Sequence, residues 1–173
     1  MVDRPDVQLS GPFDALYRQE YPGVVGVVYV LTGSAWVAED LAQEAFLRAL
    51  RDWETVSTMG APDAWVRRVA LNLAMSRFRR LRVEAAARLK LLPVPEPFEP
   101  RGAETEAFWA EVRRLPTRQA QAVALRYVED LPVERIAEVL DVATGTVKAL
   151  LHQGRERLAR QLAVKGWLDD ELR

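Results

Sequence analysis

The sequence predicts an all-α protein of two small helical domains joined by a proline-rich linker. Three observations support this prediction. Apolar residues recur at steps of three and four residues in both halves of the chain, which is the spacing of a buried helix face. Four prolines lie between Pro93 and Pro100, too many for a helix and without the alternation of a strand. The second half contains a helix-turn-helix pattern.

The composition fits two small domains and excludes several kinds of site. The chain has 173 residues, 49% of them hydrophobic, which is enough for each domain to bury a core. It has no cysteine and a single histidine, His152, so it offers no disulfide framework and no metal cluster, and no cofactor is implied. No signal peptide and no run of about 20 apolar residues is present, so we expect a cytoplasmic protein that is not inserted in a membrane.

Charge is segregated along the chain, although the net charge is only -1. Six arginines and no acid lie between Ala64 and Arg82, whereas Pro93 to Glu111 carries five glutamates against Arg101. Phosphate-binding potential is therefore expected on particular helices rather than over the whole surface.

Three helices are predicted in the first domain, over Phe13 to Leu31, Ala35 to Trp53 and Ala61 to Leu81. Ser34 is a suitable N-cap for the second helix, and the third begins with an Ala-Pro-Asp start signal. Residues Trp53 to Gly60 are predicted to form a loop. The apolar stripe of the second helix consists of Leu41, Ala45, Phe46, Ala49 and Leu50.

The linker and four shorter helices follow. Residues Pro93 to Glu106 would span up to roughly 46 Å if extended, more than one turn of duplex DNA at about 34 Å. The two domains could then touch sites a turn or more apart, although an ordinary spacer has the same composition. The shorter helices are predicted over Ala107 to Arg114, Arg118 to Val128, Val133 to Leu140 and Thr144 to Ala163.

The helix-turn-helix pattern consists of VERIAEVL from Val133 and DVATGTVK from Asp141. Asp141 occupies the tight turn, where it would adopt the left-handed conformation. The second helix carries four basic residues against Glu156 between Thr144 and Arg160, and could meet a major groove. A helix pair with a short turn is also common in helical proteins of other functions. The predicted packing residues are Ile136, Ala137, Leu140, Val147 and either Leu150 or Leu151.

Residues Leu115 to Leu158, which contain this pattern, resemble region four of the extracytoplasmic-function sigma factors, the region that binds the minus-thirty-five element. Where this chain has Ala149, Leu150 and Gln153, the family usually has Ser, Arg and Arg, so phosphate contacts are expected to dominate. The resemblance implies a DNA-binding set of Arg126, Thr144, Thr146, Lys148, Ala149, His152, Gln153 and Arg155.

The segment AEDLAQEAFLRA, which begins at Ala38, resembles region two of the same family, which grips the clamp helices of the largest polymerase subunit. An acidic and amide face beside an apolar residue can pair with arginines and bury a small apolar patch. The same face would also be stable as solvated surface, because acids near a helix N-terminus need no partner. The implied polymerase-binding residues are Asp40, Gln43, Glu44 and Leu47.

The segment AWVRRVALNLAMSRFRR, which begins at Ala64, resembles the minus-ten helix of the family. Captured single-stranded bases need an apolar or aromatic pocket and an amide to read their edges, while arginines hold the backbone. Trp65 is expected in the core. Leu71 and Ser76 replace the commoner Arg and Asp, so the promoter sequence cannot be transferred from relatives. The implied minus-ten residues are Trp53, Met59, Arg68, Asn72, Arg77, Arg79 and Arg80.

The resemblance implies an initiation factor, not an enzyme, whose partners are promoter DNA and core RNA polymerase, through the clamp helices and the flap of the second-largest subunit. An anti-sigma factor is a further candidate partner. A helix-turn-helix regulator that acts without polymerase is the alternative, but the acidic second helix and the arginine-rich third argue against it. No nucleophile-base pair, phosphate loop or metal spacing favours catalysis. The expected boundaries are an N-terminal extension (1–12), region two (13–85), a linker (86–106), region four (107–163) and a tail (164–173).

Overall fold

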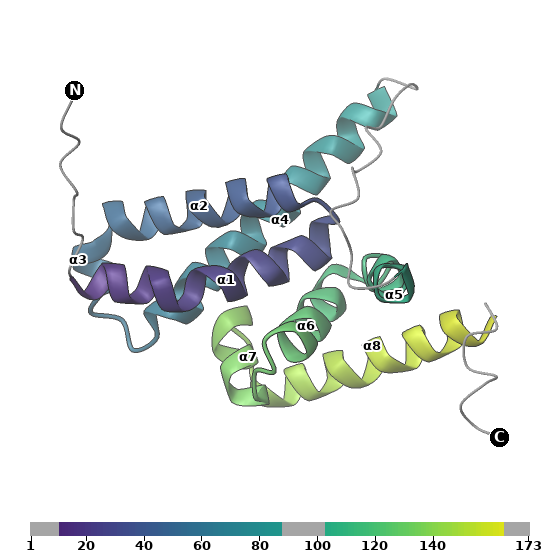
Figure 1. The fold of residues 1–173 in the computed structure, drawn as a ribbon. Coiled ribbons are helices and arrows are strands. Elements are labelled where there is room, and N and C mark those ends of the chain that lie inside the picture. The colour runs from purple at the N-terminus through teal and green to yellow at the C-terminus, as the bar shows by residue number, and fades with distance from the viewer. Residues whose placement is uncertain (1–10, 88–102, 165–173) are drawn as a thin grey trace.

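A computed structural model describes residues 11–87 and 103–164, and all regular structure within those ranges is helical (Figure 1). This agrees with the predicted fold class. The interior of the predicted linker, most of the N-terminal extension and nearly all of the C-terminal tail lie outside the described residues. Within the described ranges, no helix combines the length and the apolar character needed to cross a membrane.

The N-terminal module contains α1 (Pro12–Thr32), α2 (Ala35–Arg51), α3 (Trp53–Val56) and α4 (Pro62–Ala87). Gly33 ends α1 in the left-handed conformation, with φ 71°, and its N–H donates to the carbonyl of Tyr29. The predicted N-cap is confirmed, because Ser34 Oγ accepts a hydrogen bond from the Val37 N–H at 3.4 Å. The chain therefore turns from α1 into α2 within two residues.

The prediction of a loop over Trp53 to Gly60 was wrong in its first half. The helix α2 ends at Arg51, and the short helix α3 follows, with the Val56 N–H donating to the Asp52 carbonyl at 2.9 Å. The physical reason is Val56, which is 1% exposed and draws this turn onto the core. Helix α4 also extends to Ala87, beyond the predicted end at Leu81, through a run of alanines that favours helix.

The C-terminal module contains α5 (Ala103–Val112), α6 (Thr117–Val128), α7 (Val133–Leu140) and α8 (Thr144–Val164). Helix α5 begins at Ala103 rather than at Ala107, and the other three begin within one residue of their predicted starts. Asp141 has φ 56° and ψ 53°, so the predicted left-handed turn is confirmed. The buried packing residues are Ile136, Ala137, Leu140, Val147 and Leu151. Of the two predicted alternatives, Leu151 and not Leu150 is therefore the residue that α8 buries in the core.

One hydrophobic core fills the N-terminal module around Phe46, which is 2% exposed. The rings of Phe13, Tyr17 and Tyr21 surround it, with centroids between 5.0 and 6.5 Å away. Trp65 packs against this core as a partly buried side chain, as expected.

A second core is shared between the two modules. Val27 and Val30 of α1 and Leu71 of α4 belong to the same buried cluster as Val112 and Ile136 of the C-terminal module. Figure 1 shows the consequence, with α1 lying against α6 and α7 meeting α4. The two modules are packed on each other in this structure, which the predicted arrangement of separate domains on a linker did not include.

Close approach of α1 and α6 depends on glycine. A Cβ atom at Gly26 would lie 3.2 Å from Val128 Cγ1, and one at Gly23 would collide with the carboxylate of Glu129. Both glycines lie within α1 and face the end of α6. Without a side chain at these two positions, the backbone of α1 can approach the other module directly.

Candidate polymerase and promoter interfaces

The predicted polymerase-binding residues share the solvent-facing side of α2. Asp40 and Gln43 are exposed, the side chain of Glu44 is 38% exposed, and Leu47 is 53% exposed. The opposite side of α2 is buried in the module core, where Ala38, Ala42 and Ala45 are fully covered. The structure thus places the four side chains together on one accessible face.

A groove of about 320 Å³ lies beside this face, between α1 and α2. Its floor is the buried ring of Phe46, and its rim includes two exposed leucines, at 53% for Leu47 and 45% for Leu50. Exposed leucines beside an apolar hollow are suited to an apolar side chain of a partner helix. The groove is lined by Phe13, Asp14, Tyr17, Gln43, Phe46, Leu47 and Leu50.

The acids of this face are already paired within the chain. Arg48 Nε donates to Glu44 Oε1 at 2.8 Å, and this hydrogen bond lowers the pKa of the Glu44 carboxyl, which is therefore ionised at neutral pH. Asp40 lies 3.8 Å from Arg77, whose guanidinium stands 5.7 Å from the centroid of the Trp36 ring. A predicted polymerase-binding acid and a predicted DNA-binding arginine are thus neighbours. The exposed Trp36, at 69%, was not predicted, because periodicity does not distinguish an exposed aromatic residue at a helix start.

The predicted minus-ten residues are only partly free for DNA. Met59, Asn72 and Arg80 are exposed, so they are accessible for binding. Trp53 is half-buried, with its ring 5.3 Å from that of Phe13 in an edge-on contact. Arg79 lies within α4, but its side chain is not among those that the structure describes. Trp53 therefore packs against the module, and its role as a base reader stays a prediction.

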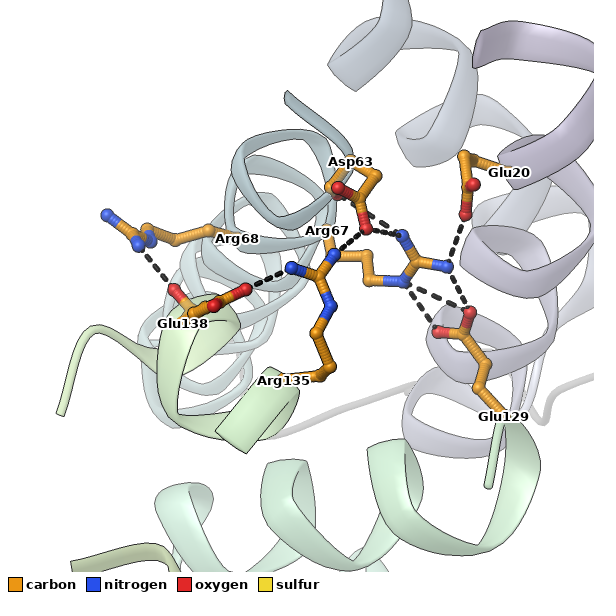
Figure 2. A network of polar contacts seen from close by, with 7 residues as sticks. All are labelled: Glu20, Asp63, Arg67, Arg68, Glu129, Arg135 and Glu138. Carbon is orange, nitrogen blue, oxygen red and sulfur yellow. Dashed lines mark hydrogen bonds and ion pairs between the residues drawn. The ribbon is translucent and has the colours of Figure 1, made fainter. Parts of the chain in front are cut away.

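Arg68, also predicted to contact the minus-ten DNA, instead binds the end of α7 (Figure 2). Its guanidinium donates to the carbonyl of Val139 at 3.0 Å and to that of Glu138 at 2.5 Å, and lies 3.5 Å from the carboxylate of Asp141. Carbonyls at a helix C-terminus lack partners within the helix and carry partial negative charge. Arg68 therefore occupies a helix end that attracts a cation.

Arg67 is one of the six arginines counted in the charge of α4, but its guanidinium is bonded within the chain. Its side chain is 7% exposed and lies between two modules, as Figure 2 shows. The guanidinium donates to both carboxylate oxygens of Glu129, at 3.0 Å from Nε, and to Glu20 Oε2 at 2.6 Å. Burial favours the neutral form, but Glu129 and Glu20 outweigh it and raise the pKa of Arg67. Arg67 is therefore a charged structural residue.

The predicted minus-thirty-five residues of α8 lie on its exposed side, but several of the whole set contact neighbours within the chain. Arg155 Nε donates to the Leu151 carbonyl at 3.2 Å, and His152 Nε2 lies 3.5 Å from Glu156 Oε1. The amide of Gln153 accepts a hydrogen bond from buried Gln119 at 3.0 Å. Arg126 binds the carbonyl of Leu131 at 3.0 Å and pairs with Asp130 at 3.3 Å, so it supports the turn before α7. The exposed set on α8 is Thr144, Thr146, Lys148, Ala149, His152, Gln153 and Arg155.

Comparison with known proteins shows the family to which the chain belongs. A model of sigma-70 region 2 matches residues 16–83, and a model of sigma-70 region 4 matches residues 105–158. The ECF RNA polymerase sigma factor SigW of Bacillus subtilis is 30% identical over 149 residues, which are 78% of this chain and 80% of that protein. The chain belongs to the extracytoplasmic-function sigma factors. The resemblance seen in the sequence is thereby confirmed.

Two further relatives are similar to this sigma factor. BldN of Streptomyces coelicolor is 32% identical, over 94% of this chain and 64% of that protein. The sigma factor RpoE of Bartonella quintana, solved in complex with the anti-sigma factor NepR, has a TM-score of 0.71 and covers 88% of this chain and 97% of that one. Its sequence identity is 21%, so this likeness shows the fold alone.

Within the described residues, no group of three or more His, Cys, Asp or Glu side chains could hold a metal ion.

Proposed function

We propose that this sigma factor binds core RNA polymerase through the exposed face of α2 and directs it to promoters, with α4 reading the minus-ten element and α8 the minus-thirty-five element. The observation that carries the proposal is the placement of Asp40, Gln43, Glu44 and Leu47 on one accessible face beside an apolar groove. Such a face suits a basic partner helix with an apolar side chain. The factor would supply binding and positioning but no catalysis, and would act in the cytoplasm, where polymerase and chromosome meet.

An anti-sigma factor is proposed as a third partner, because the structurally similar RpoE was solved in complex with NepR. A protein that blocks initiation would compete for the same α2 face or for the DNA-binding side of α8. In vitro transcription with core polymerase and genomic DNA, with mapped start sites, tests the proposed function as a whole. A helix-turn-helix regulator that acts without polymerase would produce no new start sites in this assay.

Reversing two charges on α2 is expected to abolish polymerase binding. The double variant Asp40→Lys, Glu44→Lys would turn the acidic face basic and repel a basic partner helix, while both positions remain on the surface. A matched control is Glu54→Lys, Glu134→Lys, which changes the net charge equally at two exposed acids on other helices. Pull-down of core polymerase, with circular dichroism to verify helicity, measures the effect. Undiminished pull-down by the Asp40, Glu44 variant would refute the assignment.

Two exposed residues of α4 are expected to affect promoter opening differently. Asn72→Ala would remove a base-edge contact and lower discrimination at one minus-ten position by about 1 to 3 kcal/mol. Arg80→Ala would remove a phosphate contact and weaken open complexes on every promoter without changing the preferred sequence. Permanganate footprinting on promoters with single minus-ten substitutions separates the two effects. Identical preference profiles for wild type and Asn72→Ala would contradict the reader role.

A further inference from the structure

Helices α6 and α8 lie side by side (Figure 1), and a glycine of α8 allows their close approach. A Cβ atom at Gly154 would lie 3.1 Å from Val123 Cγ2 and 3.7 Å from the Cβ atom of Gln119. The side chain of Gln153, the residue before this glycine, therefore begins near Gln119 of α6. A residue on the exposed side of α8 can in this way contact a side chain from the interior of the module.

The contact between the two glutamines is a hydrogen bond of defined direction. Gln119 is 5% exposed, and its Nε2 donates to Oε1 of the exposed Gln153 at 3.0 Å. A side-chain amide has one oxygen and one NH2 group, so a bond that engages the oxygen also fixes where the NH2 group lies. The oxygen of Gln153 is turned toward α6, and its NH2 group, which is bonded to no described residue, is left free to donate.

The amide of Gln119 is costly to bury. Among the described residues, no donor reaches its Oε1 atom, so part of this buried amide is unsatisfied. An apolar side chain of similar length would fill the same space without that cost. Packing alone therefore does not account for a glutamine at this position. What the amide contributes to the described part of the chain is its bond to Gln153.

The neighbours of Gln153 on α8 leave its amide accessible to DNA. Ala149 precedes it by one helical turn, so the two side chains are adjacent on the helix surface, and a methyl group is too short to cover an amide. Lys148 and Arg155 are exposed nearby and can hold phosphates, which carry no sequence information. Gln153 thus adds to this basic surface a donor of fixed direction that a base edge can reach.

We propose that Gln119 is a positioning residue that makes Gln153 a donor to base edges, so that Gln153 selects guanine in the minus-thirty-five element. A glutamine whose amide is free reads adenine through two bonds, since its oxygen accepts from N6 and its NH2 group donates to N7. With the oxygen turned to Gln119, only the second of these bonds remains. Guanine presents two acceptors in the major groove, N7 and O6, whereas cytosine presents only a donor. The inference rests on the proposed function, because it specifies what α8 reads.

Transcription from a promoter library tests the base preference. Core polymerase with the full-length factor transcribes duplex promoters that are randomised over the minus-thirty-five element, each identified by a barcode in its transcript. The variant Gln153→Ala identifies the base position that this side chain reads. At that position the wild type is expected to use guanine more than adenine or cytosine, by roughly twofold to tenfold. A preference for adenine or cytosine, or a Gln153→Ala profile identical to that of wild type, would overturn the proposal.

The positioning role is tested by Gln119→Met. Methionine is apolar and of similar length, and the Gln153 oxygen that it releases lies at the surface, where water can satisfy it, so we expect the variant to fold as wild type does. The released amide can turn and form both bonds to adenine, so the preference should move from guanine toward adenine by several-fold.

The matched control is Gln121→Met, which replaces another buried glutamine of α6. Gln121 is 3% exposed and, within the described residues, makes no hydrogen bond to α8. Its variant is expected to keep the wild-type base preference. The positioning role would be refuted by an unchanged preference in Gln119→Met, or by the same shift in both variants.

Nuclear magnetic resonance distinguishes failure of this inference from failure of the proposed function. In the isotope-labelled full chain without polymerase, we expect a scalar coupling across the hydrogen bond, from the side-chain nitrogen of Gln119 to the side-chain carbonyl carbon of Gln153, and its loss in Gln119→Met. Absence of this coupling, or a coupling in the opposite direction, would overturn the inference whatever the transcription assay shows. If the coupling is present but the factor directs polymerase to no promoter, the proposed function fails while the fixed direction of the Gln153 amide stands.

Discussion

Replacing Arg67 by methionine is expected to lower the free energy of unfolding by about 3 to 5 kcal/mol. The reason is the fate of its partners rather than the loss of an attraction. Glu129 and Glu20 are 8% and 14% exposed, so without Arg67 two carboxylates would be left in a poorly solvated place with no compensating charge. Urea unfolding followed by circular dichroism measures the difference.

Two controls separate this explanation from a general sensitivity of the chain. Arg18→Met removes a surface ion pair with Asp14, at 2.8 Å and with Arg18 76% exposed, and is expected to change stability by less than about 1 kcal/mol. Adding Glu20→Gln and Glu129→Gln to the Arg67 variant should restore much of the lost stability, because no charge then remains unpaired. An Arg67→Met protein as stable as wild type would mean that the two acids are solvated.

Two neighbouring residues of α2 are expected to differ in what they support. Phe46 is expected to stabilise the fold, and Leu47 to contribute to polymerase binding. Phe46→Ala would remove a ring that is 2% exposed and contacts three other rings, so the free energy of unfolding should fall by about 3 to 5 kcal/mol. Leu47→Ala changes a side chain that is 53% exposed, so its stability should stay within about 0.5 kcal/mol of wild type. Affinity of Leu47→Ala for core polymerase should nevertheless fall by more than about 1 kcal/mol, roughly fivefold or more.

Thermal unfolding and polymerase pull-down on the same preparations distinguish the two residues. Phe46→Leu serves as the conservative control, since an apolar side chain of nearly similar size keeps most of the packing. If Leu47→Ala binds polymerase as wild type does, the apolar part of the proposed α2 interface is wrong, and the acids Asp40 and Glu44 would have to account for binding alone.

Local signals in the sequence predicted most of the helices and several of their ends. Ser34 caps α2 and Asp141 adopts the left-handed turn because each depends only on residues within a few positions. The α2 face was predicted for the same reason, since periodicity alone separates Leu47 from Phe46. The same periodicity placed Leu50 in the apolar stripe, and this was wrong, because Leu50 is 45% exposed. The functional assignment of that face came from the family resemblance, and the roles of its individual residues remain predictions.

Contacts between distant segments were beyond reach of the sequence. Arg67 and Arg68 are adjacent and chemically identical, yet one is buried among carboxylates and the other caps α7. The partners of Arg67 lie 47 and 62 positions away, and no periodic pattern connects positions so far apart. Leu71 was noted as a departure from the family, but its burial between the modules depended on a packing that only the structure shows.

The composition of α1 has a consequence for how the chain folds. This helix contains Pro22 in its interior together with Gly23 and Gly26, and each glycine disfavours helix by about 1 kcal/mol relative to alanine, with a larger penalty for an interior proline. An isolated peptide of this sequence is therefore expected to be mostly random coil. Helix formation in α1 must then be driven by docking onto α2, α4 and α6. Because α6 lies in the other half of the chain, α1 is expected to reach its full stability only after the second module has been synthesised.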